Sequence, residues 1–149
     1  MADKPHIMIV AGIFYEDIVG HLETGAVKAI EAAHASCEIF NVPGAFEIPA
    51  AIKMAELAEA RNFDGYVALG CVIRGETSHY DYVCGESARA LQDLAAGDGL
   101  AIGFGILTVE NKDQALERAA VDRRNKGGEA AQSCLAMIAL RQHLQGSTD

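Results

Sequence analysis

The chain has 149 residues, half of them hydrophobic, which is enough for one domain with a sizeable core over residues 1–149. It is acidic, with 21 Asp and Glu residues against 12 Lys and Arg residues, so we expect neither a nucleic-acid surface nor an anionic-membrane surface. Because no apolar run reaches the roughly 20 residues that cross a bilayer, and because "MADKPHIMIVAG" lacks the order of a signal peptide, we expect a cytoplasmic protein.

The apolar residues predict an alternation of strands and helices. In chain order we expect a strand at 7–12, a helix at 18–33, a strand at 37–42, a helix at 48–58, a strand at 66–73, a helix at 83–95, a strand at 100–109, and two helices around 116–120 and 131–138 that separate near "NKGG". The strand runs are continuous, which is typical of parallel strands buried on both faces. The sequence therefore predicts a three-layer α/β sandwich with right-handed crossovers.

Cysteine and histidine spacing gives no sign of a metal site. The four cysteines contain no CxxC pair, and the five histidines contain no HxxxH or HxH pair. Three of the cysteines lie in apolar runs, so we expect buried free thiols instead of disulfides or metal ligands.

Candidate functional residues follow the strands. In an open parallel sheet, ligands bind at the carboxyl ends of the strands, where loops lead into helices. Four segments occupy such positions: "GIFYED" (12–17), "VPGAFEIP" (42–49), "IRGETSHYD" (73–81) and "FGILTVEN" (104–111). We expect their side chains to converge on one cleft.

The segment 73–81 is the richest in polar groups. Gly75 permits a tight turn, and Thr77 or Ser78 can cap a helix with Asp81 in its first turn, which is a complete structural explanation. The same arrangement presents unpaired backbone N–H groups to an anion such as phosphate. Both interpretations remain open on the residues alone.

His79 also has two interpretations. In the first turn of a helix and near Arg74, its protonated form is disfavoured, so a neutral imidazole would be available as a proton acceptor. Alternatively, it is an ordinary surface histidine.

The remaining candidates are equally ambiguous one at a time. Glu47 could accept hydrogen bonds from ligand hydroxyls, and Phe14 and Phe104, placed by this pattern at strand ends, could stack on a planar ring or fill the core. Arg118 would ordinarily be a solvated helix charge, and Lys126 a loop lysine.

The order and spacing of these segments resemble the lumazine synthase family. The resemblance rests on "FYEDI", "VPGAFEIP", "ALGCVIRGETSHYDYV", "FGILTVEN" and "RAAVDRRNKGGEAA", and runs from about residue 7 to 140. It implies a flavodoxin-like fold with a four-stranded parallel sheet. It also implies an enzyme, a transferase that condenses 5-amino-6-(D-ribitylamino)uracil with 3,4-dihydroxy-2-butanone 4-phosphate to 6,7-dimethyl-8-ribityllumazine. That reaction releases phosphate and water, is the penultimate step of riboflavin biosynthesis, and needs no metal or organic cofactor.

By this resemblance each candidate acquires a role. Phe14 would stack on the pyrimidine, and the backbone of Val72 and Ile73 would hold the uracil edge. His79 would transfer protons. The ribityl chain would lie along Ala45, Phe46 and Glu47, and the phosphate would bind to Gly75, Glu76, Thr77 and Arg118.

The resemblance further implies a homopentamer with its active sites between neighbouring subunits. Phe104, Arg118 and Lys126 would come from the neighbouring chain. Family members that build a hollow shell of pentamers commonly carry a "GTKAGNKG"-like turn, which is "AVDRRNKG" (120–127) here. Because Arg123 and Arg124 replace small residues in it, we expect a free pentamer or a pair of pentamers.

Two residues depart from the family pattern. Tyr15 stands where Asn is common, and Glu76 places a carboxylate beside the phosphate loop, so we expect Glu76 to point outward or to pair with a cation.

Two alternative functions remain. One is a flavin- or lumazine-binding protein or assembly subunit with weak catalysis, and the other is the similar archaeal-type riboflavin synthase. The presence of His79, Arg118 and Lys126 favours the enzyme, and the "GETSH" and "NKGGEAA" segments favour lumazine synthase.

Overall fold

The secondary structure follows the predicted alternation. A computed structural model of the chain describes residues 4–59 and 62–146. The elements are β1 (His6–Gly12), the 3-10 turn η1 (Ile13–Tyr15), α1 (Glu16–Ala32), β2 (Ser36–Val42), the 3-10 turn η2 (Ala45–Glu47), α2 (Ile48–Leu57), β3 (Gly65–Ile73), α3 (His79–Asp98), β4 (Ile102–Val109), α4 (Lys112–Ala119) and α5 (Lys126–Leu144).

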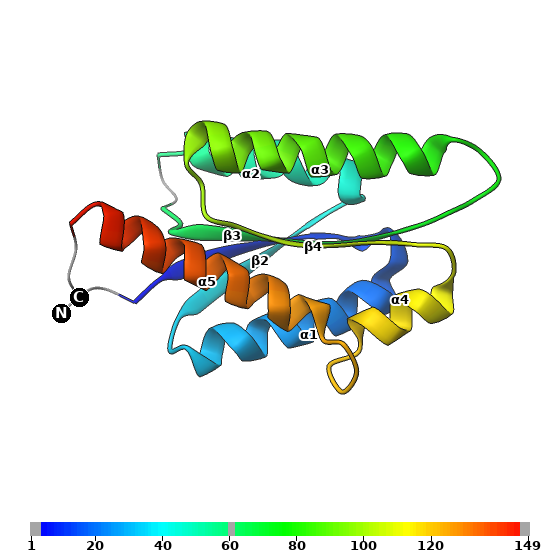
Figure 1. The fold of residues 1–149 in the computed structure, drawn as a ribbon, viewed down its shortest axis with the longest axis horizontal. Coiled ribbons are helices and arrows are strands. Elements are labelled where there is room, and N and C mark those ends of the chain that lie inside the picture. The colour runs from blue at the N-terminus through cyan, green and yellow to red at the C-terminus, as the bar shows by residue number, and fades with distance from the viewer. Residues whose placement is uncertain (1–3, 60–61, 147–149) are drawn as a thin grey trace.

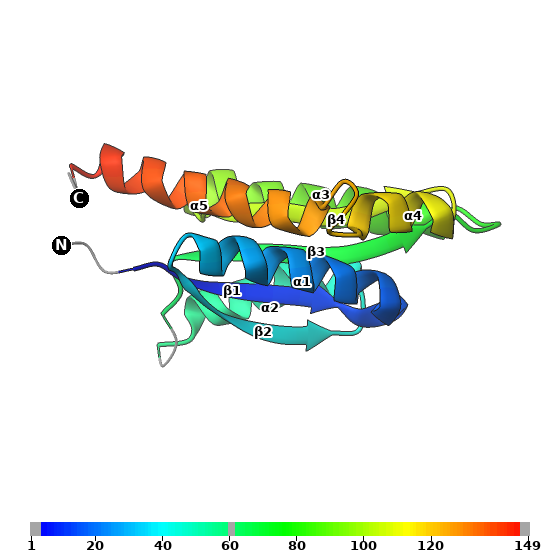
Figure 2. The same ribbon diagram turned by 90° about the horizontal axis from the view of Figure 1, so that it is seen from below.

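The strands form one parallel sheet in the order β2-β1-β3-β4. Helices α2 and α3 cover one face, and α1, α4 and α5 cover the other (Figure 1; Figure 2 shows the strands from below). The connection from β1 to β2 runs through α1 on one face. The connections from β2 to β3 and from β3 to β4 run in the opposite direction, through α2 and α3 on the other face, so all three crossovers have the same hand. The predicted three-layer, flavodoxin-like α/β sandwich is confirmed.

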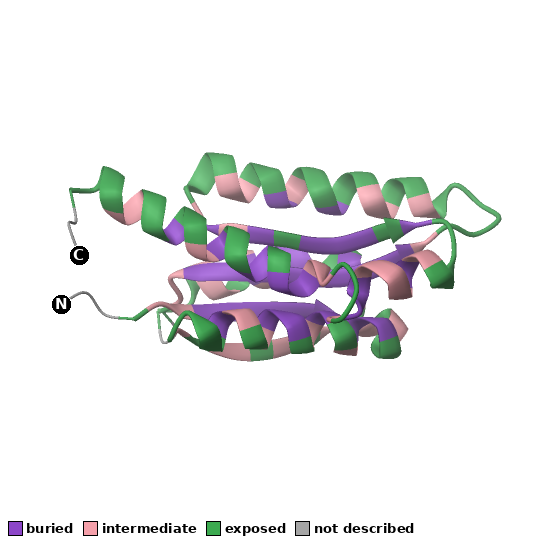
Figure 3. Ribbon diagram, turned by 60° about the horizontal axis from the view of Figure 1, so that its bottom comes forward, coloured by how far each residue is buried: buried purple, intermediate pink, exposed green. Residues whose placement is uncertain are grey.

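Two apolar cores lie on the two sides of the sheet. One is built around Ile7, Ile9 and Leu69 with α1 and α5, and the other around Val10 and Ile48 with α2 and α3. The sheet and the inner sides of the helices are the buried parts of the molecule (Figure 3). The prediction that every strand is buried on both faces is wrong for the two edge strands: β2 contains no buried residue, and β4 exposes Phe104 and Thr108.

Helix α3 is less covered than its length implies. Of its 20 residues only Ser87 and Leu91 are buried. Most of its surface faces solvent in the single chain (Figure 3). The apolar spacing identified the helix correctly, and its exposed side leaves a surface available to another molecule.

The break between the last two helices lies earlier than predicted. Residues 120–125 form the connection, and "NKGG" is the start of α5, not a separator. Asn125 adopts a left-handed conformation (φ 47°), and its side-chain oxygen accepts from the backbone N–H of Gly128. A Cβ atom on Gly127 would overlap the backbone of Leu22, so glycine there lets α5 approach α1 closely.

Two sequence expectations concern the cysteines and membranes. All four cysteines are free; Cys71 and Cys134 are buried, and Cys37 and Cys84 are half-buried. None of the helices within residues 4–59 and 62–146 is long and apolar enough to cross a bilayer.

Candidate active site

A cleft of about 570 Å³ opens at the carboxyl ends of β1, β2 and β3. This volume is within the range of small-molecule sites. Its walls are Phe14 and Tyr15, residues 43–47, residues 71–73, and Gly75, Thr77, His79, Tyr80, Tyr82 and Val83. Three of the four segments predicted to converge therefore do so, because parallel strands end at one edge of the sheet.

The segment after β1 presents an aromatic ring to this cleft. Strand β1 ends at Gly12, and the 3-10 turn that follows places Phe14 outward with 76% of its surface exposed. The ring of Tyr15 meets it edge to face, with centroids 4.9 Å apart and an interplanar angle of 82°. An exposed ring held by another ring is suited to stacking on a planar ligand.

The segment after β2 adds a carboxylate. Residues 45–47 form a single 3-10 turn in which Ala45 is buried against the core and Phe46 and Glu47 are exposed. The Glu47 carboxylate makes no hydrogen bond or ion pair within the described part of the chain, so its oxygens are free to accept from ligand hydroxyls.

The end of β3 and the start of α3 form the third wall. Val72 and Ile73 close the strand, and residues 74–78 lead to His79, the first residue of α3. The Thr77 hydroxyl oxygen accepts from the backbone N–H of His79 across 3.3 Å. Ser78 occupies the N-cap position, but its side chain makes no capping hydrogen bond, so capping falls to Thr77 instead.

The His79 residue is exposed at the cleft, and its ring makes no hydrogen bond or ion pair with another described residue. Its nitrogens are thus accessible to a bound molecule. Backbone N–H groups at the helix start lie beside it, which is a favourable arrangement for an anion.

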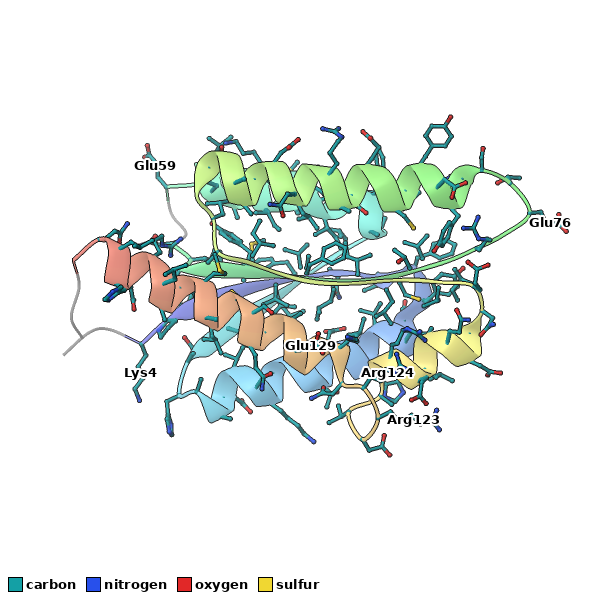
Figure 4. All side chains as sticks on the ribbon, viewed as in Figure 1. Lys4, Glu59, Glu76, Arg123, Arg124 and Glu129 are labelled. Atoms are coloured by element: carbon teal, nitrogen blue, oxygen red, sulfur yellow. The ribbon has the colours of Figure 1, made fainter. Side chains whose placement is uncertain are left out.

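Glu76 points away from the cleft. It lies at the tip of the loop between β3 and α3, with its side chain directed to solvent (Figure 4). The expectation that this carboxylate turns outward is confirmed, and only the backbone of Glu76 remains a candidate for anion binding.

Phe104, Arg118 and Lys126 do not line this cleft. Phe104 is the third residue of β4, not a strand-end residue as predicted, and it is 49% exposed beside α3. At about 3.3 Å per residue, it lies roughly 16 Å before the end of its strand. The fourth predicted segment therefore does not reach the cleft of its own chain.

The two basic residues lie on α4 and at the start of α5. Arg118 donates to the backbone carbonyl of Gln114 (3.1 Å) and forms no ion pair with the carboxylates that the structure describes. Lys126 is the first residue of α5, where its Nζ lies 3.2 Å from both carboxylate oxygens of Glu129. It is a helix residue, not a loop lysine.

Some lining residues were not identified from the sequence. Cys71 and Tyr82 contribute to the walls from outside the four predicted segments, and the available signal for Tyr82 was its helical spacing from His79. Burial raises the pKa of the Cys71 thiol to about 12. Desolvation likewise raises the pKa of the Tyr80 hydroxyl. Both groups are therefore neutral at physiological pH.

Metal ligation finds no support in this geometry. Over residues 4–59 and 62–146 there is no group of three or more His, Cys, Asp or Glu side chains arranged to hold a metal ion.

Comparison with known proteins gives consistent matches over nearly the whole chain. The family model described as 6,7-dimethyl-8-ribityllumazine synthase matches residues 4–142. The chain is 56% identical to a 6,7-dimethyl-8-ribityllumazine synthase of Bartonella tribocorum, over 95% of this chain and 93% of that protein. It is 54% identical to 6,7-dimethyl-8-ribityllumazine synthase 1 of Rhizobium meliloti, over 95% of each chain. It is 52% identical to the corresponding protein of Agrobacterium fabrum, over 96% of this chain and 99% of that one.

Proposed function

Because the chain belongs to the 6,7-dimethyl-8-ribityllumazine synthase family, we propose that the cleft at the ends of β1, β2 and β3 is its active site. The enzyme is a transferase of riboflavin biosynthesis. It condenses 5-amino-6-(D-ribitylamino)uracil with 3,4-dihydroxy-2-butanone 4-phosphate, releasing phosphate and water. The observation that carries the assignment is the convergence of an exposed aromatic ring, a free carboxylate and a helix start with a free histidine.

The uracil substrate occupies the side formed by the segments after β1 and β2 and by the end of β3. Phe14 stacks on the pyrimidine, and the backbone groups of Val72 and Ile73 hold the uracil edge. The ribityl chain lies along Ala45 and Phe46, with Glu47 accepting from its hydroxyls. The support is that all of these residues line one cleft and that the Glu47 carboxylate has no competing partner among the described residues.

The phosphate of the other substrate binds at the start of α3. The N–H groups of Gly75 and Glu76 and the hydroxyl of Thr77 surround it, and the positive end of the α3 dipole favours its charge. This charge grows as the C–O bond to the phosphate breaks, so donors fixed in place stabilise the transition state more than the bound substrate.

His79 moves protons during the reaction. Imine formation, phosphate elimination and ring closure each transfer protons between carbon, nitrogen and oxygen. An imidazole at the junction of the two half-sites can accept a proton in one step and return it in another. Holding the amine and the ketone together supplies much of the acceleration, since both substrates are reactive.

A neighbouring chain in a homopentamer completes the site with Phe104, Arg118 and Lys126. Three features support this: Phe104 is exposed on edge strand β4, Arg118 has no carboxylate partner among the described residues, and α3 is largely uncovered. The guanidinium of Arg118 supplies the cation that the phosphate half-site lacks within one chain.

A subunit-mixing experiment tests this shared site. At a limiting concentration of the butanone phosphate each variant alone should have low activity, Arg118→Ala because its KM is raised and His79→Ala because its kcat is lowered. Co-expressed, they form mixed pentamers in which some sites combine intact His79 of one chain with intact Arg118 of the next, so activity returns. If mixing restores nothing, each site lies within one chain.

The assembly stops at a pentamer or a pair of pentamers. Arg123 and Arg124 project from the loop between α4 and α5 (Figure 4) and lie 3.6 Å and 3.9 Å from oxygens of Glu117. Bulky ion-paired residues there hinder closure of a shell. Sedimentation tests this, because a particle far larger than two pentamers would contradict it.

A cytoplasmic location accords with the four free thiols, since reducing compartments keep cysteines unpaired.

The activity itself is tested by mixing the protein with both substrates and following the absorbance of the lumazine product. Binding of substrate or lumazine without turnover would identify a binding protein instead.

A further inference from the structure

Arg74 is the one basic residue of the loop between β3 and α3, and it does not line the cleft. Its Nε donates to Oε2 of Glu110 across 2.9 Å. Its Nη1 lies 3.6 Å from Oδ1 of Asp81, and its guanidinium carbon lies 4.3 Å from the centroid of the Tyr80 ring. The guanidinium of Arg74 is therefore paired with carboxylates at its edges and with an aromatic ring on its face.

These contacts join three separate elements. Arg74 itself follows the end of β3, Glu110 follows the end of β4, and Tyr80 and Asp81 belong to the first turn of α3. The backbone N–H of Arg74 also donates to the carbonyl of Val109 across 2.9 Å. One residue thus ties the ends of two strands to the start of the helix that carries His79.

Little else restrains the intervening loop. Residues 75–78 are exposed, and Ser78 makes no side-chain cap. The described side-chain contact within the loop is the 3.3 Å hydrogen bond from the His79 N–H to Thr77. Without Arg74, the first turn of α3 would lose both its ion pair and its cation–π contact with the strand ends.

We propose that Arg74 is a positioning residue that holds the phosphate-binding loop and His79 against the ends of β3 and β4. The proposal rests on the function proposed above. Arg74 is not itself a phosphate ligand, because Glu110, Asp81 and Tyr80 already occupy its guanidinium. A displaced loop would misalign the donors for the phosphate. It would leave the uracil half-site in place, because that half-site is built on Phe14, residues 45–47 and the paired end of β3, which do not move with the loop.

Arg89 provides a matched control. It lies on α3 and, like Arg74, pairs with two carboxylates, Glu86 and Asp93, each at 2.9 Å. Both of these partners also lie on α3, so its ion pairs do not reach the loop. A Met substitution at Arg74 or Arg89 removes one guanidinium and two ion pairs while keeping a long side chain. The two variants differ in whether the lost contacts reach the strand ends.

The test is steady-state kinetics of wild type, Arg74→Met, Arg74→Lys and Arg89→Met, with each substrate varied in turn and sedimentation checking assembly. For Arg74→Met we expect the KM of the butanone phosphate to rise and kcat/KM to fall by about tenfold to a hundredfold. The KM of the uracil substrate should stay within about twofold of the wild-type value, a much smaller change than the one expected for the butanone phosphate. Arg74→Lys should recover part of the loss, because it keeps the charge without the planar fork. Arg89→Met should behave as wild type.

Two results would overturn the role of Arg74. If wild type is active and Arg74→Met has the same kinetic constants as Arg89→Met, the contacts of Arg74 are ordinary surface ion pairs. Equal increases in the KM of both substrates would show a general structural effect. Failure of the wild-type protein to turn over the substrates would instead reject the proposed function, and the Arg74 proposal with it.

Discussion

Gly12 and Gly44 approach so closely that a Cβ atom on Gly12 would lie 2.6 Å from the carbonyl carbon of Gly44. Gly12 ends β1, and Gly44 precedes the turn that carries Phe46 and Glu47. This close approach sets the spacing between the Phe14 segment and the Glu47 segment, and so sets the width of the uracil half-site.

We expect Gly12→Ala to separate these segments. The added methyl meets backbone atoms that have no freedom to rotate away, so the variant should lose about 2 kcal/mol of unfolding free energy and bind the uracil substrate more weakly. Denaturant unfolding and the KM of that substrate measure the two effects. Gly20→Ala is the control, because no atom lies within 4 Å of its added Cβ in α1, and it should gain up to about 1 kcal/mol. Similar behaviour of the two variants would contradict the role of the close approach.

His79 and Arg118 should affect different kinetic constants. His79→Ala removes a proton-transfer group, so kcat should fall by about a hundredfold or less, the low end of the range for general acid–base catalysis. Phosphate affinity should remain close to wild type. Arg118→Ala removes a cation that acts on the phosphate, so it should mainly raise the KM of the butanone phosphate. Equal losses in both constants in both variants would refute this separation of roles.

Tyr15 should matter through the orientation of Phe14. The edge-to-face contact between the rings (4.9 Å between centroids) is worth about 1 kcal/mol, so Tyr15→Asn should weaken binding of the uracil substrate by roughly fivefold. Titration of the uracil substrate alone, followed by calorimetry, measures this. Tyr15→Phe keeps the ring and should bind as wild type. If Tyr15→Asn binds equally well, the ring of Phe14 needs no such support.

Stability should decline in alkaline solution because of buried thiols. Burial raises the pKa of the Cys134 thiol to about 12 from an ordinary value of 9.0. Between these values the unfolded thiol is ionised and the folded thiol is not, so the unfolded state binds fewer protons and the free energy of unfolding falls as pH rises. Each such thiol contributes a slope of up to about 1.4 kcal/mol per pH unit, and below pH 9.0 it contributes none.

Denaturant unfolding over this pH range measures that slope. Cys134→Ala should show a shallower decline than wild type, although its stability near neutral pH is lower because of the lost packing. Cys37→Ala serves as the comparison, because Cys37 is only half-buried. It should change the pH dependence of the unfolding free energy less than Cys134→Ala does. Parallel curves for wild type and Cys134→Ala would exclude the thiol as the cause.

Much of the site was predictable because its residues belong to local patterns. Phe14, Glu47 and His79 each follow a continuous apolar strand, and parallel strands end at one edge of a sheet. Phe104 was misplaced because the segment 104–111 was drawn to include most of the strand itself: both the predicted strand and β4 end at residue 109, five residues after Phe104. Tyr82 was missed because the apolar pattern of α3 does not show which of its other residues face the cleft.

The sequence by itself determined the family, the alternation of strands and helices, and the residue types that the chemistry needs, because these depend on short-range periodicity and motif spacing. The tertiary structure decided the strand order β2-β1-β3-β4, the near contact of Gly12 with Gly44, and the partners of Arg74. Glu110 lies 36 residues from Arg74 along the chain, and only the pairing of β3 with β4 brings their charged groups to 2.9 Å. Long-range contacts of this kind arise when strands pair and helices pack, and no local pattern encodes them.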